Sequence, residues 1–363
     1  MSYIVQKRLA FSGNLCYHSK VVSESDRHAA VAQLDRVTGY EPVGQGFESL
    51  LPCQLPNTNV FGSFFFFLEM RFVSVFCFLG LRLVKREEAW YDIAIHYIIY
   101  KERCDMGMKI SVLYLGRMEF PKFRLVQWKD EEEMIKSPAV ALLIQHPTLG
   151  NILYDTGNCH EHEALYTPDM LHNYPVVECI SVKEALAAKG LTPDDIDQII
   201  ISHLHFDHAA GLKDFVGTKA IKNVLVSEAD LKEAWFSVTT GNGGAYIRSL
   251  FDVEGIQFQT INQDTWLAED FGLFVQKSHT PGVIGLILKT EKSGTILTTS
   301  DTIYTRDSYD QGIPPGGTIN KTTDEFFDNL ERVKKMEKEL DAQLLFGHDF
   351  QQIQEWAAKG WIE

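Results

Sequence analysis

The alternation of apolar and polar positions becomes regular only beyond residue 108. From there on, short apolar runs are bounded by Gly, Pro, Asn or Asp, which is the pattern of buried strands separated by turns. Two of these runs flank the turn Pro147–Gly150 and predict a hairpin. The predicted strands are 109–115, 139–145, 151–155, 197–202, 223–226, 271–276, 283–289, 295–300 and 343–346.

Helix signals lie among these strands. Ser181 and Glu184 have the spacing of a capping box, and Gly190 follows where a C-terminal cap belongs. Thr322 and Glu325 form a similar pair at the start of a predicted helix over 323–340. Strands with interspersed helices predict an α/β chain in which a sandwich of sheets is covered by helices.

Residues 1–105 differ from the rest in composition. They carry no net charge, so the whole −15 lies in residues 106–363. Their Phe-rich stretch 60–84 is interrupted by Glu69, Arg71 and Arg82. Since a charge at the centre of a span costs about 2.5–3.5 kcal/mol, this stretch is a poor membrane helix.

The run 30–53 resembles the accidental translation of a transfer-RNA gene. We therefore expect 1–105 to be a non-native or disordered extension, with translation beginning at Met106 or Met108. Residues 106–363 are then the functional domain. A genuine N-terminal anchor is the alternative, and an intact mass near the full 41.2 kDa would contradict our expectation.

The net charge and the cysteine content limit the classes of binding partner and the compartment that we expect. A net charge of −15 disfavours nucleic acid and anionic membrane surfaces, because nothing offsets repulsion from phosphates. Six cysteines are too few for a disulfide scaffold. We expect a cytoplasmic protein, a monomer or homodimer, that acts on a small molecule without nucleic-acid or membrane partners.

The segment 202–208, SHLHFDH, concentrates metal-ligand side chains directly after a predicted strand. In an extended segment, alternate positions share a face, so His203, His205 and Asp207 would converge and His208 would point elsewhere. Such a set suits two adjacent cations better than one. Zn²⁺ is the expected metal, and Mn²⁺, Fe²⁺ and Co²⁺ are compatible alternatives.

Three later residues have the same placement at a strand end. His279, Asp301 and His348 each stand where a predicted strand gives way to a loop. Seven side chains can hold two cations if a carboxylate bridges them and a water or hydroxide completes the coordination.

These motifs resemble the metallo-β-lactamase superfamily, whose signature is H-x-H-x-D-H, over nearly all of residues 108–363. The resemblance implies the αββα sandwich of that fold. It also implies that His203, His205 and His279 bind one metal, that Asp207, His208 and His348 bind the second, and that Asp301 bridges. The D-T-G turn appears as 155–157, which makes Asp155 a candidate to orient a metal-bound imidazole.

Within the superfamily, SHLHFDHA (202–209), SDTIYT (300–305) and FGHD (346–349) are most similar to N-acyl-homoserine lactonases. The resemblance implies a metal-dependent hydrolase that opens the lactone ring, as in quorum quenching. In those enzymes the tyrosine matching Tyr304 contacts the substrate carbonyl. Asp207 or Asp301 is a candidate proton carrier. The segment 277–283 keeps His279 but departs from the common P-G-H-x-P-G-H.

Other functions and simpler roles stay open. A thioester hydrolase or another lactonase of the superfamily is the alternative enzyme, and a lactone sensor with little turnover is the non-enzymatic one. Tyr304 and Phe206 could serve only in packing, and Asp155 could only cap a turn. Guesses for an acyl-chain groove are Met118, Phe123, Phe206, Trp235 and Phe236.

Several histidines are predicted to have no metal role. The segment 159–163, CHEHE, has a ligand-like composition, but it lies in a polar loop that the family does not use. A lone histidine is usually a surface or core residue. His146, His160, His162 and His172 are placed in that class.

Overall fold

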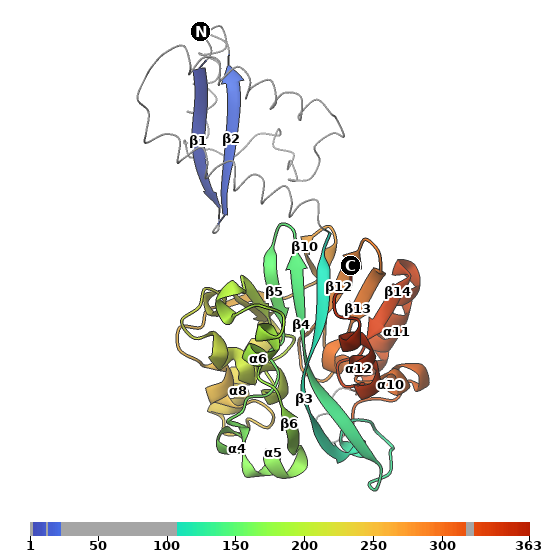
Figure 1. The fold of residues 1–363 in the computed structure, drawn as a ribbon. Coiled ribbons are helices and arrows are strands. Elements are labelled where there is room, and N and C mark those ends of the chain that lie inside the picture. Colours follow the sequence, from blue (N-terminus) through green and yellow to red (C-terminus); the bar gives the residue numbers. More distant parts are fainter. Residues whose placement is uncertain (1–2, 12–13, 23–106, 317–322) are drawn as a thin grey trace. The chain divides into compact units, whose positions relative to one another are not determined.

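The predicted strands assemble into two β-sheets (Figure 1). The computed structural model describes residues 3–11, 14–22, 107–316 and 323–363. The chain divides into two units, Met1–Leu83 and Val84–Glu363. In the first unit, the described residues are the antiparallel pair β1 (Tyr3–Phe11) and β2 (Asn14–Val22), which the sequence analysis did not predict. The rest of the predicted extension lies outside the described residues, so its nature stays a prediction.

The larger sheet has seven strands in the order β6–β3–β4–β5–β7–β8–β9. The pairs β6–β3, β3–β4 and β4–β5 are antiparallel, whereas β5–β7, β7–β8 and β8–β9 are parallel. Parallel neighbours need crossover connections, and these carry the helices of one face. The strands are β3 (Lys109–Pro121), β4 (Met134–His146), β5 (Gly150–Tyr154), β6 (Val176–Cys179), β7 (Gln198–Ile200), β8 (Val224–Ser227) and β9 (Phe258–Ile261).

The smaller sheet has five strands in sequence order. Its first four strands pair antiparallel, and the last pair, β13–β14, is parallel. The strands are β10 (Thr265–Ala268), β11 (Phe271–Gln276), β12 (Val283–Thr290), β13 (Gly294–Thr298) and β14 (Ala342–Leu345).

Helices cover the outer faces of both sheets (Figure 1). The capping box at Ser181 opens a helix as predicted, and the long predicted helix is present. Thr322, of the second predicted capping pair, lies outside the described residues. The helices are α4 (His162–Leu165), α5 (Pro168–Asn173), α6 (Val182–Ala187), α7 (Phe206–Ala209), α8 (Glu228–Thr239), α9 (Arg248–Phe251), α10 (Arg306–Gln311), α11 (Thr323–Leu340) and α12 (Phe350–Ala358).

The alternation of side chains along the strands divides the core into layers. On β4, Leu142 and Ile144 join the core between the two sheets, while Leu143 joins the core under α6. On β12, Ile287 faces the other way and packs with Phe326 of α11. The resulting order is helices, sheet, sheet, helices, which confirms the predicted αββα sandwich.

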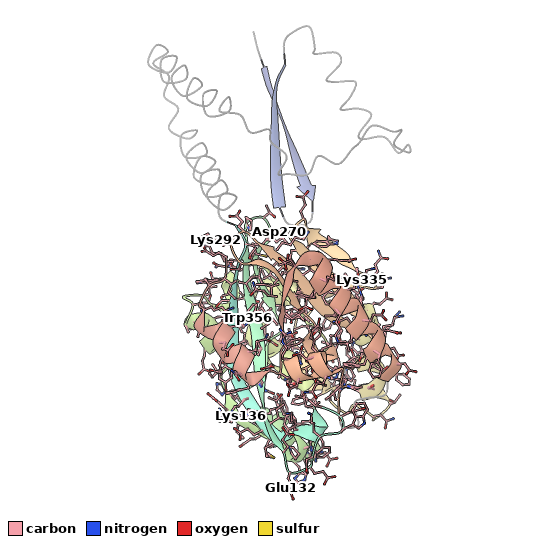
Figure 2. All side chains as sticks on the ribbon, turned by 90° about the vertical axis from the view of Figure 1, so that its right-hand side faces the viewer. Glu132, Lys136, Asp270, Lys292, Lys335 and Trp356 are labelled. Carbon is pink, nitrogen blue, oxygen red and sulfur yellow. The ribbon has the colours of Figure 1, made fainter. Side chains whose placement is uncertain are left out.

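Helix α11 shows how one element meets both core and solvent. Phe326 and Leu330, one turn apart, are buried against the smaller sheet. Lys335 lies on the exposed side (Figure 2). Helix α12 contributes Trp356, which is labelled in Figure 2, to the core between the sheets.

The structure corrects some predicted boundaries. The strand expected at 295–300 ends at Thr298, and Ser300–Thr302 forms a 3₁₀ turn, η6. Strands β6, β9 and β10 were not predicted, and of the helices only α6 and α11 were. Across the described residues, no helix combines the length and the apolar character needed to cross a membrane.

Candidate metal centre

The histidine-rich segment follows β7 and changes conformation in its middle. His205 is still extended, with φ −68° and ψ 158°, but α7 begins at the next residue. Asp207 and His208 therefore project from a helical turn. The expectation that His203, His205 and Asp207 share a face is wrong, because the extended geometry ends at His205.

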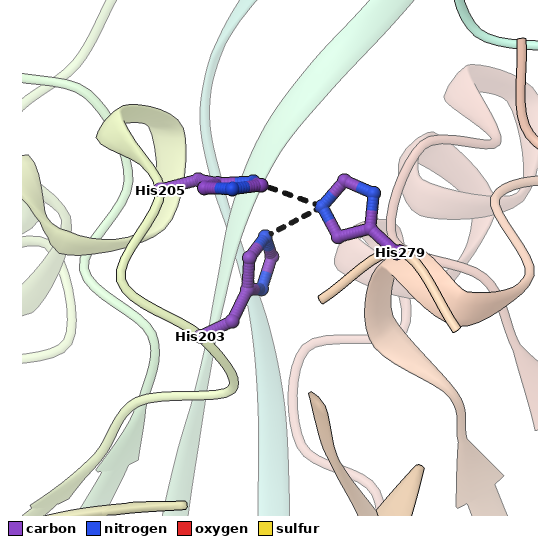
Figure 3. A group of neighbouring side chains, drawn as sticks. All are labelled: His203, His205 and His279. Atoms are coloured by element: carbon purple, nitrogen blue, oxygen red, sulfur yellow. Dashed lines mark hydrogen bonds between the residues drawn. The ribbon is translucent and has the colours of Figure 1, made fainter. Parts of the chain in front are cut away.

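His203 and His205 meet His279, which follows β11 (Figure 3). Nε2 of His279 lies 2.9 Å from Nε2 of His203 and 2.9 Å from Nδ1 of His205. Burial lowers the pKa of His203 and of His205 well below the ordinary value, and that of His279 to about 4. Three neutral imidazoles thus direct nitrogen atoms toward one point.

Asp207, His208, Asp301 and His348 form a second buried group. Nε2 of His348 lies 3.1 Å from Oδ1 of Asp301, and Nε2 of His208 lies 3.2 Å from it. Burial opposes ionisation of Asp301, yet His348 and His208 hold the pKa of this carboxyl well below its usual range. Burial raises the pKa of Asp207.

Asp301 faces both groups. While its Oδ1 lies against the second group, its Oδ2 lies 3.5 Å from Nε2 of His279 and 3.8 Å from Nε2 of His203. The structure therefore brings all seven sequence-predicted ligand residues together, with this carboxylate between the two groups.

The donors of both groups fit divalent metal cations. Within each group, one ligand atom per residue lies within 4.8 Å of all the others. Nε2 of His208 is buried and, although it lies 3.2 Å from Oδ1 of Asp301, it forms no aligned hydrogen bond with any of the described residues, which is the state of an atom placed for a ligand. Imidazole and carboxylate together suit Zn²⁺ and related ions. The site is thus capable of binding metal.

A second layer of contacts fixes the imidazole rings. Oδ2 of Asp155 lies 2.8 Å from Nδ1 of His208, as expected for a residue that orients it. Oγ of Ser202 lies 3.0 Å from Nδ1 of His203, and Oγ of Ser137 lies 2.8 Å from Nδ1 of His348. The sequence analysis missed Ser137, because a serine inside a strand carries no metal-site signal.

Strained backbone marks the same region. Asp155, His279 and Ser300 have φ of 61°, 71° and 48°, in the left-handed region that residues other than glycine rarely adopt. Such conformations persist only where the surroundings hold them, and they cluster at functional sites.

Tyr304 and a cavity complete the site. The Tyr304 hydroxyl lies 2.8 Å from Nδ1 of His279, and burial raises the pKa of this hydroxyl well above its ordinary value. The cavity has a volume of about 590 Å³ and reaches Asp207, Asp301 and both groups of histidines. Its apolar wall includes Met118, Phe120, Phe123, Leu125, Met170, Tyr174 and Phe206.

Two guessed groove residues do not line this cavity. Trp235 packs edge-on against Phe251, with ring centroids 5.3 Å apart, and Phe236 is 65% exposed on α8. Both belong to a helix that covers the larger sheet rather than to the cavity wall. Met118, Phe123 and Phe206 do line it.

The histidines predicted to have no metal role have ordinary partners where the structure shows one. Nε2 of His146 lies 2.9 Å from Asp270, and Nε2 of His160 lies 2.8 Å from Glu184. Among the described residues, metal-type groups of three or more form only at the two places above, so the 159–163 segment contributes none.

Comparison with known proteins agrees with this architecture. A family model of the metallo-beta-lactamase superfamily matches residues 135–348, more than half of the chain. An N-acyl homoserine lactonase from a Bacillus species is 28% identical over 226 residues, which are 61% of this chain and 84% of that protein. The N-acyl homoserine lactonase AttM of Azorhizobium caulinodans is 26% identical over 231 residues, 58% of this chain and 82% of that protein.

Solved structures share the fold. A variant of B. thuringiensis AiiA with N-decanoyl-L-homoserine bound at its active site has a TM-score of 0.60 and 22% identity, over 69% of this chain and 97% of that one. An N-acyl homoserine lactone hydrolase with N-hexanoyl-L-homoserine at its metal centre has a TM-score of 0.59 and 23% identity, over the same shares of the two chains. The chain therefore belongs to the metallo-β-lactamase superfamily, as a metal-dependent hydrolase.

Proposed function

We propose that this hydrolase opens the lactone ring of N-acyl homoserine lactones, the chemistry of quorum quenching. The observation that carries the proposal is the position of Tyr304, whose hydroxyl lies beside His279 in a cavity that reaches both groups of ligand residues. The names of the relatives at 26% and 28% identity support the same substrate class.

The metals of this proposal are two divalent cations, with Zn²⁺ as the first choice. His203, His205 and His279 would hold one cation, and Asp207, His208 and His348 the other, with Asp301 shared between them. When bound, the cations supply Lewis acidity and lower the pKa of water at the site, so that hydroxide forms near neutral pH.

Tyr304 is the residue proposed to act on the substrate carbonyl. Nε2 of His279 faces His203, so its lone pair must be free if it is to bind a cation. A neutral imidazole with a free Nε2 lone pair carries its proton on Nδ1, the atom beside the Tyr304 hydroxyl. This Nδ1–H donates to the Tyr304 oxygen, which leaves the O–H free to donate to a carbonyl oxygen in the cavity. A donor aimed at developing negative charge lowers the barrier to ring opening.

Asp207 is the proposed proton carrier. Its side chain lines the cavity together with Tyr304 and would face an ester held there. There it can take the proton from the hydroxyl group that has added to the carbonyl carbon and pass it to the ring oxygen as the C–O bond breaks. Phe206, the preceding residue, gives the acyl group an apolar wall.

A panel assay tests the function. Zinc-loaded protein is given acyl homoserine lactones, other lactones, thioesters and β-lactams, and acid release is followed with a pH indicator. We expect the acyl homoserine lactones to have the highest kcat/KM. Preferential turnover of a thioester or another ring would overturn the proposal, and binding of the lactone without acid release would identify a sensor.

A further inference from the structure

The wall of the cavity carries several polar side chains besides those of the metal centre. Arg124, Gln127, Lys129 and Asn173 line it. Within the described ranges, none of these four side chains forms an ion pair, and the Arg124 guanidinium lies within hydrogen-bonding reach of the Tyr174 hydroxyl. All four can donate hydrogen bonds, and two of them are cationic.

Arg124 is unlike the other arginines of residues 107–316 and 323–363. Arg117, Arg248, Arg306 and Arg332 each lie within 4 Å of a carboxylate. The Arg124 Nε is buried and has no partner within the described part of the chain. In a chain with 49 acidic and 34 basic residues, an unpaired guanidinium on a cavity wall calls for an anion from outside.

Aromatic rings hold this guanidinium in place. Its Cζ lies 5.3 Å from the centre of the Phe123 ring and 6.0 Å from that of Tyr174. Such contacts orient a guanidinium without neutralising it. Its two terminal nitrogens, which are not buried as Nε is, can then donate parallel hydrogen bonds, the geometry that a carboxylate accepts.

Tyr174 connects Arg124 to the metal centre. Its ring centroid lies 6.2 Å from that of Phe206, the residue before Asp207. Arg124, Tyr174 and Phe206 all line the same cavity. A substrate with its ester at the metal centre can therefore extend along Tyr174 and end at the guanidinium.

We propose that the preferred substrates carry a carboxylate at the far end of their acyl group, and that Arg124 is the specificity-determining residue that binds it. This rests on the proposed lactonase function, which it refines. Lys129 adds positive charge to the same wall, and Glu131 is the acidic side chain that lines the cavity besides Asp207 and Asp301 of the metal centre. A plain alkyl end would instead remove water from Arg124 and leave its donors unpaired.

The test uses matched pairs of lactones. N-succinyl, N-adipoyl and N-suberoyl homoserine lactones, each with a free terminal carboxylate, are compared with the N-butanoyl, N-hexanoyl and N-octanoyl compounds. For at least one pair, kcat/KM should be about tenfold higher for the carboxylate, as one charge-assisted hydrogen bond allows. Arg124→Met keeps the packing stem without the charge and should abolish that preference, and Arg124→Lys should keep part of it.

Arg248→Met is the matched control, because Arg248 pairs with Asp252 on α9 and does not line the cavity. It should keep the wild-type preference. Equal kcat/KM within every pair, or a preference that survives in a folded Arg124→Met protein, would overturn the proposal.

A binding measurement separates this inference from the function itself. Calorimetry with the ring-opened products, N-adipoyl-homoserine against N-hexanoyl-homoserine, needs no turnover. Suppose that no lactone is hydrolysed, but that the carboxylated product binds about tenfold more tightly and only Arg124→Met removes this difference. The proposed reaction is then wrong, while the proposed carboxylate site is supported. If neither product difference nor kinetic preference depends on Arg124, the site is refuted.

Discussion

Asp301 is the side chain that both ligand groups share. Replacing it with Asn keeps the shape but removes the charge that faces four histidines. We expect Asp301→Asn to lower the metal content of purified protein and to reduce kcat/KM by more than about a hundredfold. Elemental analysis and the lactone assay measure the two effects.

Asp310→Asn is the control for that change, since Asp310 is a surface carboxylate on α10 that lies 3.8 Å from Arg306 and away from the metal centre. It should leave both quantities unchanged. An Asp301→Asn protein with full metal content would show that this carboxylate does not bridge.

Tyr304 makes a separable contribution. Tyr304→Phe removes the hydroxyl beside His279 and leaves all seven ligand residues in place. The metal content should stay at the wild-type level, while kcat should fall roughly a hundredfold or more, as for the loss of one oxyanion donor. If kcat is unaffected, the tyrosine only packs.

For single residues of the candidate site, the sequence allowed predictions from residue type and position in the chain, but not from which other residues each one contacts. His203 could be named because it lies in a dense cluster of ligand-type residues, and His279 and His348 because each stands where a predicted strand gives way to a loop. Ser137 and Arg124 could not, because a serine in a strand and an arginine in a connection are common. Only the folded chain shows Ser137 against an imidazole and Arg124 beside a cavity.

At the scale of helices and strands, the apolar runs predicted the buried central strands well and the strands at the sheet edges poorly. Strand β11 matches its predicted bounds because four of its residues in succession are buried. Strands β9 and β10 are only partly buried, so their sequences show no continuous apolar run. Helix α8 was missed, although Ser227 caps its first turn by accepting from the Asp230 N–H.

Asp230 joins α8 to the metal-binding segment. Its carboxylate accepts hydrogen bonds from the Leu204 N–H and the Tyr246 hydroxyl, both at 2.7 Å. Burial raises the pKa of Asp230 to about 6. A carboxyl whose folded pKa exceeds its unfolded value stabilises the fold at low pH, and this contribution is lost as the pH rises through the folded pKa.

Asp230→Asn keeps an acceptor but cannot ionise. The free energy of unfolding of the wild type, relative to this variant, should therefore fall by about 3 kcal/mol between about pH 4 and pH 6. Urea unfolding at a series of pH values measures the difference. Asp252→Asn, at an exposed carboxylate, should follow the wild-type pH dependence. A wild-type-to-Asp230→Asn difference that is constant with pH would contradict the assignment.

At the scale of the whole molecule, the metal centre lies where the two sheets meet. His203, His205, Asp207 and His208 follow β7 of the larger sheet, whereas His279, Asp301 and His348 follow β11, β13 and β14 of the smaller one. Bound cations would therefore connect the two halves of the sandwich and stabilise their association.

Chelation tests that coupling. Since a ligand present at about a thousand times its Kd adds about 4 kcal/mol of stability, removing the cations with a chelator should lower the melting temperature by about 10 °C. Adding Zn²⁺ back should restore both melting temperature and activity, and Mg²⁺ should not. A melting temperature that does not respond to the chelator would show that the centre and the fold are uncoupled.

The order of the ligand residues along the chain has a consequence for biosynthesis. A growing polypeptide that has emerged through His279 already contains all three histidines of the first group, whereas the second group still lacks Asp301 and His348. Metal acquisition on the ribosome would therefore be sequential, with the three-histidine position filled first and the dinuclear enzyme completed only after the smaller sheet has been synthesised.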